Sequence, residues 1–128
     1  MKWDKVLPGA MLVSSLFLIA TPPALAAGDA NKGKSLYARC ATCHSLKPGV
    51  NMIGPSLSKM WGRTAGTSAK FNYSPAMKKY AKAWNVALLD AYIRAPSKTV
   101  PGTRMVFAGM PNAKDREDLI AYLQQAAK

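Results

Sequence analysis

Apolar residues spaced three and four positions apart predict three amphipathic helices in the chain beyond residue 27. In the first, over Ala30 to Arg39, Gly33 shares one face with Leu36 and Tyr37. The other two are predicted over Val86 to Ala95 and Ala113 to Ala127. The apolar stripe of the helix over Val86 to Ala95 consists of Leu88, Leu89, Tyr92 and Ile93. The stripe of the helix over Ala113 to Ala127 consists of Leu119, Ile120 and Leu123, together with Tyr122 or with Ala126 and Ala127.

Residues typical of helix termini support these boundaries. An N-cap stands directly before each predicted helix, namely Asp29, Asn85 and Asn112. Ser74 followed by Pro75 predicts a further short helix from Ala76 to about Lys82. Pro96 stops the helix predicted over Val86 to Ala95. The remaining segments, rich in Gly, Pro, Ser and Thr, are predicted as loops. Gly33 lowers helix stability by about 1 kcal/mol, which is tolerable if the C-terminal helix crosses there.

The first 26 residues have the features of a secretory signal. Lys2 and Lys5 form a basic start, interrupted by Asp4, and an apolar core follows from Ala10 to Ala20. Ala24-Leu25-Ala26 predicts cleavage after residue 26, with cleavage after residue 27 as the alternative. The apolar run is shorter than the roughly 20 residues of a membrane span, which disfavours an uncleaved anchor. Residues 27–128 then form one small exported domain without repeats, located in the periplasm.

The stretch Cys40-Ala41-Thr42-Cys43-His44 has the Cys-x-x-Cys-His pattern of covalent c-type haem attachment. Two intervening residues fit the span between neighbouring haem vinyl groups, to which the thiols add as thioethers. His44, the only histidine in the chain, would bind the iron as its proximal ligand. Since a small, loop-rich chain buries little surface by itself, a haem at its centre would complete the apolar core.

Three other interpretations of this stretch compete. Zinc needs four good ligands, and two cysteines with one histidine leave one missing. A thioredoxin-like redox dithiol needs a βαβ context, and no strand-rich pattern surrounds the motif. A structural disulfide stays open but would leave His44 without a role.

An iron bound by one histidine has a second axial position, for which the protein candidates are Met, His or Lys. The methionines beyond the signal are Met52, Met60, Met77, Met105 and Met110. A methionine usually fills core space. Met105 stands out because Pro101-Gly102-Thr103-Arg104-Met105 is a rigid, non-helical loop after a helix stop. Met110, between Gly109 and Pro111, is the alternative.

Together these motifs resemble a class I cytochrome c of the mitochondrial type and its soluble bacterial relatives. The similarity covers essentially residues 28–128, and its segments are Cys40–His44, Gly54–Leu57, Trp61–Arg63, Pro101–Gly109 and Arg116–Leu123. The resemblance implies an all-α fold of short helices and loops wrapped around one covalent haem c. It also implies that Met105 is the axial methionine, with Met110 as filler near the haem edge.

The resemblance assigns further roles around the haem. The Pro55 carbonyl would accept a hydrogen bond from the His44 ring and orient it. Arg63, Tyr73 and Trp84 would surround the buried propionates, which need donors, with ordinary packing as the alternative for Trp84. Tyr92 and Thr103 would lie near the methionine sulfur, and Phe107 would lie at the exposed haem edge. Gly33 and Tyr122 would lie where the terminal helices cross.

Several positions depart from the family pattern. Met77 replaces an asparagine of the internal polar network, which puts that network in doubt. The loop between His44 and Gly54 is one residue shorter. Around the haem edge, apolar residues or proline replace residues that are often charged, namely Met52, Met110 and Pro111, so a more apolar docking face is expected.

The charge is strongly basic, with 18 Lys and Arg against 6 Asp and Glu, and removal of the signal lowers the net charge from +12 to +11. Such a surface favours acidic partners or transient association with anionic membranes. The export signal and the lack of a recognised motif disfavour nucleic acid. A basic ring around the haem edge is expected from Arg39, Lys47, Lys98 and Arg104, with an apolar centre of Met52, Phe107 and Met110.

With His44 and Met105 on the iron, no position stays open for a substrate, which favours one-electron transport over enzyme activity. The expected protein is a monomeric carrier in a respiratory or photosynthetic chain. Its partners would be the acidic docking faces of quinol–cytochrome c reductase, a terminal oxidase or a photosynthetic reaction centre, or periplasmic dehydrogenases. The alternatives are a peroxidase-like activity after Met105 dissociates and a tightly held subunit of one redox complex.

Overall fold

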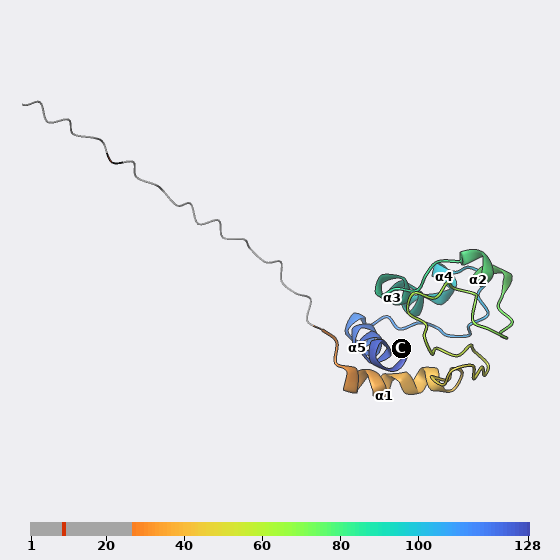
Figure 1. The fold of residues 1–128 in the computed structure, drawn as a ribbon, viewed down its shortest axis with the longest axis horizontal. Coiled ribbons are helices and arrows are strands. Elements are labelled where there is room, and N and C mark those ends of the chain that lie inside the picture. The colour runs from red at the N-terminus through yellow and green to blue at the C-terminus, as the bar shows by residue number, and fades with distance from the viewer. Residues whose placement is uncertain (1–8, 10–26) are drawn as a thin grey trace, which may run out of the picture.

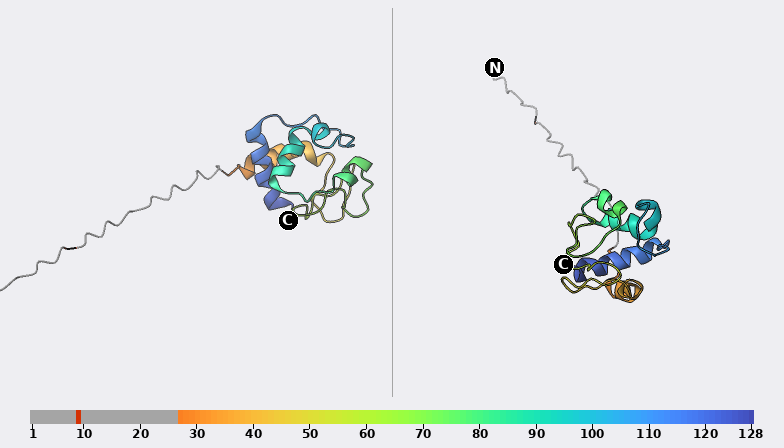
Figure 2. Two further views of the ribbon diagram at one scale, coloured as in Figure 1. Left: turned by 90° about the horizontal axis from the view of Figure 1, so that it is seen from above. Right: turned by 90° about the vertical axis from the view of Figure 1, so that its right-hand side faces the viewer.

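The computed structural model describes Gly9 and residues 27–128. Within these residues the helices are α1 (Ala30–Ala41), α2 (Pro75–Tyr80), α3 (Val86–Arg94), α4 (Pro96–Thr99) and α5 (Ala113–Ala126). The same residues form no strand beyond an isolated bridge between Thr64 and Ala83, so the predicted all-α class is confirmed. α5 lies between α1 and α3 (Figures 1 and 2). The predicted signal, apart from Gly9, lies outside the described residues.

The N-caps expected from the sequence are formed. The Asp29 carboxylate accepts hydrogen bonds from two amides in the first turn of α1, at 2.9 and 3.2 Å. The side chains of Ser74, Asn85 and Asn112 each accept a bond from the amide three residues further on, at 3.1, 2.9 and 3.1 Å. These local bonds satisfy amides that have no partner inside the helix, and they place all four helix starts within one residue of the prediction.

Several helix ends differ from the prediction, since α1 runs on to Ala41 rather than Arg39, and α3 and α5 each end one residue earlier than expected. α2 ends at Tyr80 rather than near Lys82, because Ala81 adopts a left-handed backbone conformation with a φ of 43°. The segment after Pro96 was predicted as a loop, and this is wrong, since Pro96 opens the short helix α4. A proline ends the preceding helix, but its fixed φ suits the first position of a new one. The Thr99 hydroxyl then donates to a carbonyl of α3 at 2.9 Å and holds α4 against it.

The terminal helices cross at Gly33, as expected. A Cβ at this position would collide with the Asp118 carbonyl of α5 and lie 2.8 Å from the Cβ of Tyr122. The Tyr37 and Tyr122 rings pack beside the crossing with their centroids 5.5 Å apart. The close approach of the two backbones therefore explains why a glycine stands inside α1.

Asp118 is fully buried at the same crossing, which the sequence pattern did not indicate. One of its carboxylate oxygens accepts hydrogen bonds from the Lys114 ammonium at 2.6 Å and from the Asp29 amide at 2.7 Å. The Lys114 ammonium, and then the Asp29 amide, hold the pKa of Asp118 below its usual value. The carboxylate thereby joins the beginnings of α1 and α5.

The apolar core runs from this crossing to α3. Its buried members include Leu89, Ile93, Leu119, Ile120 and Leu123. The Trp61 ring nitrogen donates to the Leu123 carbonyl at 3.0 Å, which attaches the long loop between α1 and α2 to the end of α5. This loop and the segment after α4 enclose the space beside the core.

Candidate functional site

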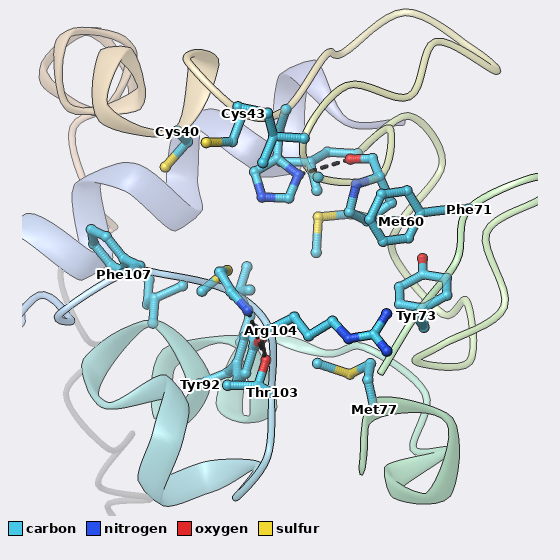
Figure 3. Close-up of a pocket in the computed structure, with 18 of the residues that line it drawn as sticks. Cys40, Cys43, Met60, Phe71, Tyr73, Met77, Tyr92, Thr103, Arg104 and Phe107 are labelled. Carbon is cyan, nitrogen blue, oxygen red and sulfur yellow. Dashed lines mark hydrogen bonds between the residues drawn. The ribbon is translucent and has the colours of Figure 1, made fainter. Parts of the chain in front are cut away.

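A cavity of about 550 Å³ lies between α3, α5 and the two long loops. It is lined by all the residues that the sequence and the resemblance assigned to the cofactor, namely Cys40, Cys43, His44, Pro55, Arg63, Tyr73, Trp84, Tyr92, Thr103, Met105 and Phe107. Cys40 and Cys43 lie on one side of it, and Tyr92, Thr103 and Arg104 lie across from them (Figure 3). The fold thus brings residues from five separate segments around one space.

The two cysteines stand where α1 ends. The amides of Cys43 and His44 both donate to the Cys40 carbonyl, at 3.0 and 2.8 Å, so the chain turns and both thiols and the histidine ring line the same cavity. Both thiols are free and half-buried. Burial raises the pKa of the Cys40 thiol, an effect that Cys43 increases and Arg39 opposes. A redox-active dithiol has a lowered pKa, so this environment disfavours that interpretation.

The His44 ring is fixed by the expected hydrogen bond to Pro55. Its Nδ1 lies 2.8 Å from the Pro55 carbonyl, and it is the donor because a carbonyl can only accept. Burial lowers the pKa of His44, and the bond to Pro55 opposes this only in part. The ring is therefore neutral at pH 7 with its proton on Nδ1, which leaves the Nε2 lone pair for a metal.

Two further residues hold this histidine, and sequence reasoning missed their roles. A Cβ at Gly54 would lie 2.7 Å from His44 Nδ1, so only a glycine lets the ring pack against the backbone here. The Tyr37 hydroxyl donates to the His44 carbonyl at 2.9 Å, and burial raises the pKa of Tyr37 to about 12. In the sequence, the role of Gly54 could have been suspected from its place directly before Pro55. Tyr37 was predicted only as a core residue of the first helix.

Of the methionines in the described chain, Met60, Met77 and Met105 line the cavity. Met60 and Met77 are 3 % and 6 % exposed and belong to the apolar core. Met105 instead lies on the loop that faces the cysteines across the cavity. The Thr103 hydroxyl accepts a bond from the Met105 amide at 3.3 Å and shares a bond of 2.8 Å with the Tyr92 hydroxyl. Thr103 therefore links the backbone of Met105 to Tyr92 of α3.

Met110 does not line the cavity. It is 2 % exposed, and its amide donates to the Ile93 carbonyl at 2.8 Å. The chain turns inward at Gly109, which has a φ of 104° and where a Cβ would collide with the Arg94 carbonyl. The expectation that Met110 belongs to an exposed apolar centre at the haem edge is therefore wrong.

The residues expected near carboxylates also meet at the cavity. The two terminal nitrogens of Arg63 donate to the carbonyls of Ser58 and Ser56, both at 3.0 Å, which fixes the guanidinium. Tyr73 and Trp84 line the same cavity. The cavity thus offers a cation, a hydroxyl and an indole N–H, all suited to an anionic group.

Arg104 was expected to be part of the basic ring. Its side chain is exposed, and it extends across the cavity toward Tyr73 and Met77 (Figure 3). Phe71, which packs edge-on against Tyr73 with the ring centroids 4.8 Å apart, lines the cavity as well. The sequence did not indicate a role for Phe71, because a loop lacks the regular spacing of apolar residues that marks the buried face of a helix or strand.

The family model for cytochrome c matches residues 30–127 of the chain. The chain belongs to the cytochrome c family. It is 45 % identical over 106 residues to a cytochrome c of Gibberella zeae, covering 81 % of this chain and 100 % of that protein. A cytochrome c2 of Rhodoblastus acidophilus is 45 % identical over 100 residues, with 77 % and 94 % covered. The solved structure of cytochrome cH from Methylobacterium extorquens aligns with a TM-score of 0.72 at 38 % identity, covering 77 % of this chain and 99 % of that one.

Membership of the cytochrome c family makes the chain a haem-containing electron-transfer protein rather than an enzyme. The residues of the cavity fit a covalent haem c, since they offer two free thiols, a neutral imidazole and an apolar lining. The volume lies in the range of about 300–1,000 Å³ that holds compact ligands. Within residues 27–128, no group of three or more His, Cys, Asp or Glu is placed to hold a metal ion by itself. None of the helices described is long and apolar enough to cross a membrane.

Proposed function

We propose that the protein is a one-electron carrier whose haem c is attached through Cys40 and Cys43, with His44 and Met105 as the axial ligands of the iron. The observation that carries the proposal is the His44 ring, which is fixed by the Pro55 carbonyl and shares one cavity with both thiols and with the loop of Met105. When bound, the haem supplies an iron that gains and loses one electron.

The cysteine side attaches and orients the cofactor. Cys40 and Cys43 would hold the haem through thioethers, each thiol adding its sulfur to one carbon of a vinyl group and its hydrogen to the other. The Pro55 carbonyl, by accepting the Nδ1–H of His44, makes Nε2 a stronger donor and fixes the ring plane. Gly54 and Tyr37 keep the same ring and its backbone in place.

The opposite side sets the potential. The Met105 thioether would favour reduced iron, since methionine–histidine ligation raises the potential of a haem. The Thr103 hydroxyl shares a hydrogen bond with Tyr92 of α3 and accepts one from the Met105 amide, which fixes the loop beside Met105. With His44 and Met105 both holding the iron, no position would be open for a substrate, which favours electron transfer over substrate chemistry.

Arg63, Tyr73 and Trp84 would receive the haem propionates. A buried carboxylate is costly unless it is paired and hydrogen-bonded. Arg63 is held by two backbone carbonyls, so its cation is already positioned before the cofactor enters. These donors would let a charged haem sit within an otherwise apolar cavity.

The distribution of charge supports docking onto acidic partners. The sequence has no Asp or Glu between Asp29 and Asp90. The acidic residues that form salt bridges with Lys or Arg of their own chain are Asp90, Asp115, Glu117 and Asp118. The unpaired charge is therefore mostly positive, and Arg39 and Arg104 bring part of it to the cavity. Such a field speeds encounter with an acidic docking face.

An apolar centre for this docking face is supplied by residues other than Met110. Ile53 and Val106 line the cavity and are 81 % and 103 % exposed, so they lie at its mouth. Met52 next to Ile53 is 47 % exposed, and Phe107 next to Val106 is half-buried. A small apolar contact within a basic surround suits a partner that must be released quickly.

The carrier would work outside the cytoplasmic membrane after cleavage of residues 1–26, or of 1–27. Its donors and acceptors would be acidic faces of membrane redox complexes, that is, a quinol–cytochrome c reductase, a terminal oxidase or a photosynthetic reaction centre, or periplasmic dehydrogenases. The basic surface would also allow transient contact with the membrane surface. The protein would act as a monomer.

Electron exchange with a purified terminal oxidase or reaction centre is expected to slow steeply as salt rises, because screening shortens the reach of the field. Arg39→Glu and Lys98→Glu should lower the second-order rate constant more than Lys128→Glu, which makes the same charge change beyond α5. Stopped-flow kinetics at several ionic strengths measure both effects. Rates that do not depend on salt, or equal effects of the three reversals, would contradict the proposed docking face.

A further inference from the structure

A buried arginine of α5, Arg116, contacts the end of the loop that carries Met105. Arg116 is 6 % exposed. One terminal nitrogen of its guanidinium donates to the carbonyls of Met110 and Pro111, at 2.8 and 2.9 Å. Its Nε donates to the Asp90 carboxylate of α3 at 2.6 Å. A single side chain therefore joins α5, α3 and this loop.

The segment of residues 100–111, here called the methionine loop, is attached to α3 near both ends. Near its beginning, Tyr92 of α3 shares the 2.8 Å hydrogen bond with Thr103. Near its end, the Met110 amide donates to a carbonyl of α3 at 2.8 Å, and Arg116 holds the two carbonyls that follow. Met105 lies between these attachments, so both of them decide where its sulfur stands.

A contribution to the free energy of unfolding does not by itself explain why position 116 holds an arginine. A buried ion pair often gives no more stability than apolar residues of similar size, and here the Asp90 side chain is 36 % exposed, which weakens the pair further. An apolar side chain, however, has no donors. The planar guanidinium reaches two successive carbonyls and a carboxylate at once, which neither an apolar residue nor a lysine does.

We propose that Arg116, oriented by Asp90, is a positioning residue that fixes the methionine loop and thereby keeps the Met105 thioether on the iron. This inference rests on the proposed ligation by His44 and Met105. It assigns to the contact a role in ligand retention that is separate from its share in global stability.

Azide binding to the ferric, haem-loaded protein tests this role, because azide takes the axial position only when Met105 leaves it. The apparent affinity rises with the fraction of molecules in which that position is open. Arg116→Lys should raise the affinity roughly ten-fold, which corresponds to the loss of a hydrogen bond to a charged group. Asp90→Asn should raise it by a smaller factor, since Arg116 keeps its two carbonyl partners.

Ile120→Val is the control, because it removes one buried methyl group from the apolar core while leaving the hydrogen bonds of Arg116 intact. It should lower the free energy of unfolding without raising the azide affinity. Equal effects of Asp90→Asn, Arg116→Lys and Ile120→Val would overturn the inference. If Arg116→Lys does not fold, Asp90→Asn against the same control decides the question.

The Met105→Ala background separates the inference from the ligand assignment. In that background Asp90→Asn should leave the azide affinity unchanged, since the loop has no ligand to hold. If Asp90→Asn raises the azide affinity in that background by the same factor as in the parent protein, the positioning role is overturned. If Met105→Ala by itself does not raise the affinity, the ligand assignment is wrong instead.

Discussion

Met105→Ala is expected to abolish the methionine–iron charge-transfer band of the ferric protein and to lower its reduction potential. The band requires the sulfur–iron bond, and the thioether stabilises ferrous iron. The reason to choose Met105 is its loop, which lies across the cavity from the cysteines and whose Thr103 hydroxyl shares a hydrogen bond with Tyr92 of α3. Visible absorption spectroscopy and a potentiometric titration measure the two effects.

Met110→Ala is the matched control for this prediction. Met110 is fully packed in the core and does not line the cavity, so its truncation should cost about 2–5 kcal/mol of stability while the band is retained. Loss of the band in Met110→Ala, with retention in Met105→Ala, would transfer the ligand role to Met110.

Gly33→Ala is expected to destabilise the haem-loaded protein by about 3 kcal/mol or more. The added Cβ would meet the Asp118 carbonyl of the crossing helix, and a backbone atom cannot move aside as a flexible side chain can. Intrinsic helix propensity predicts the opposite sign, since alanine is favoured over glycine by up to about 1 kcal/mol. Denaturant unfolding followed by circular dichroism gives the free energy.

Ser35→Ala serves as the control for Gly33→Ala, because Ser35 lies on the exposed side of the same helix. Its effect should stay within about 0.5 kcal/mol. A stabilised Gly33→Ala protein would mean that the α1–α5 crossing is looser than described.

The helix starts could be predicted from the sequence because an N-cap acts on amides only two or three residues away, as Asp29 does for α1. The end of α2 could not, because Ala81 takes a left-handed conformation that local pattern associates with glycine. α4 was missed because Pro96 both ends one helix and opens the next. From the sequence alone, a proline is more readily recognised as the end of a helix than as the start of the next one.

The candidate site was predictable where chemistry requires a fixed spacing, as for Cys40, Cys43 and His44. The preference for Met105 over Met110 came from the rigid loop of residues 101–105 and was strengthened by the family resemblance, since both methionines follow loop-forming residues. Tyr37, Gly54 and Arg116 could not be assigned, because their roles arise from contacts that only the folded chain makes. The Arg116–Asp90 bond, for example, joins residues 26 positions apart on two helices.

The central claim, a covalent haem c on an exported chain, is tested most directly by intact mass spectrometry of the protein purified from cells that attach haem. We predict one species with the mass of the chain starting near Ala27 plus one haem, since thioether formation loses no atoms. A mass without haem would contradict the attachment through Cys40 and Cys43, and a mass that retains residues 1–26 would contradict the cleaved signal.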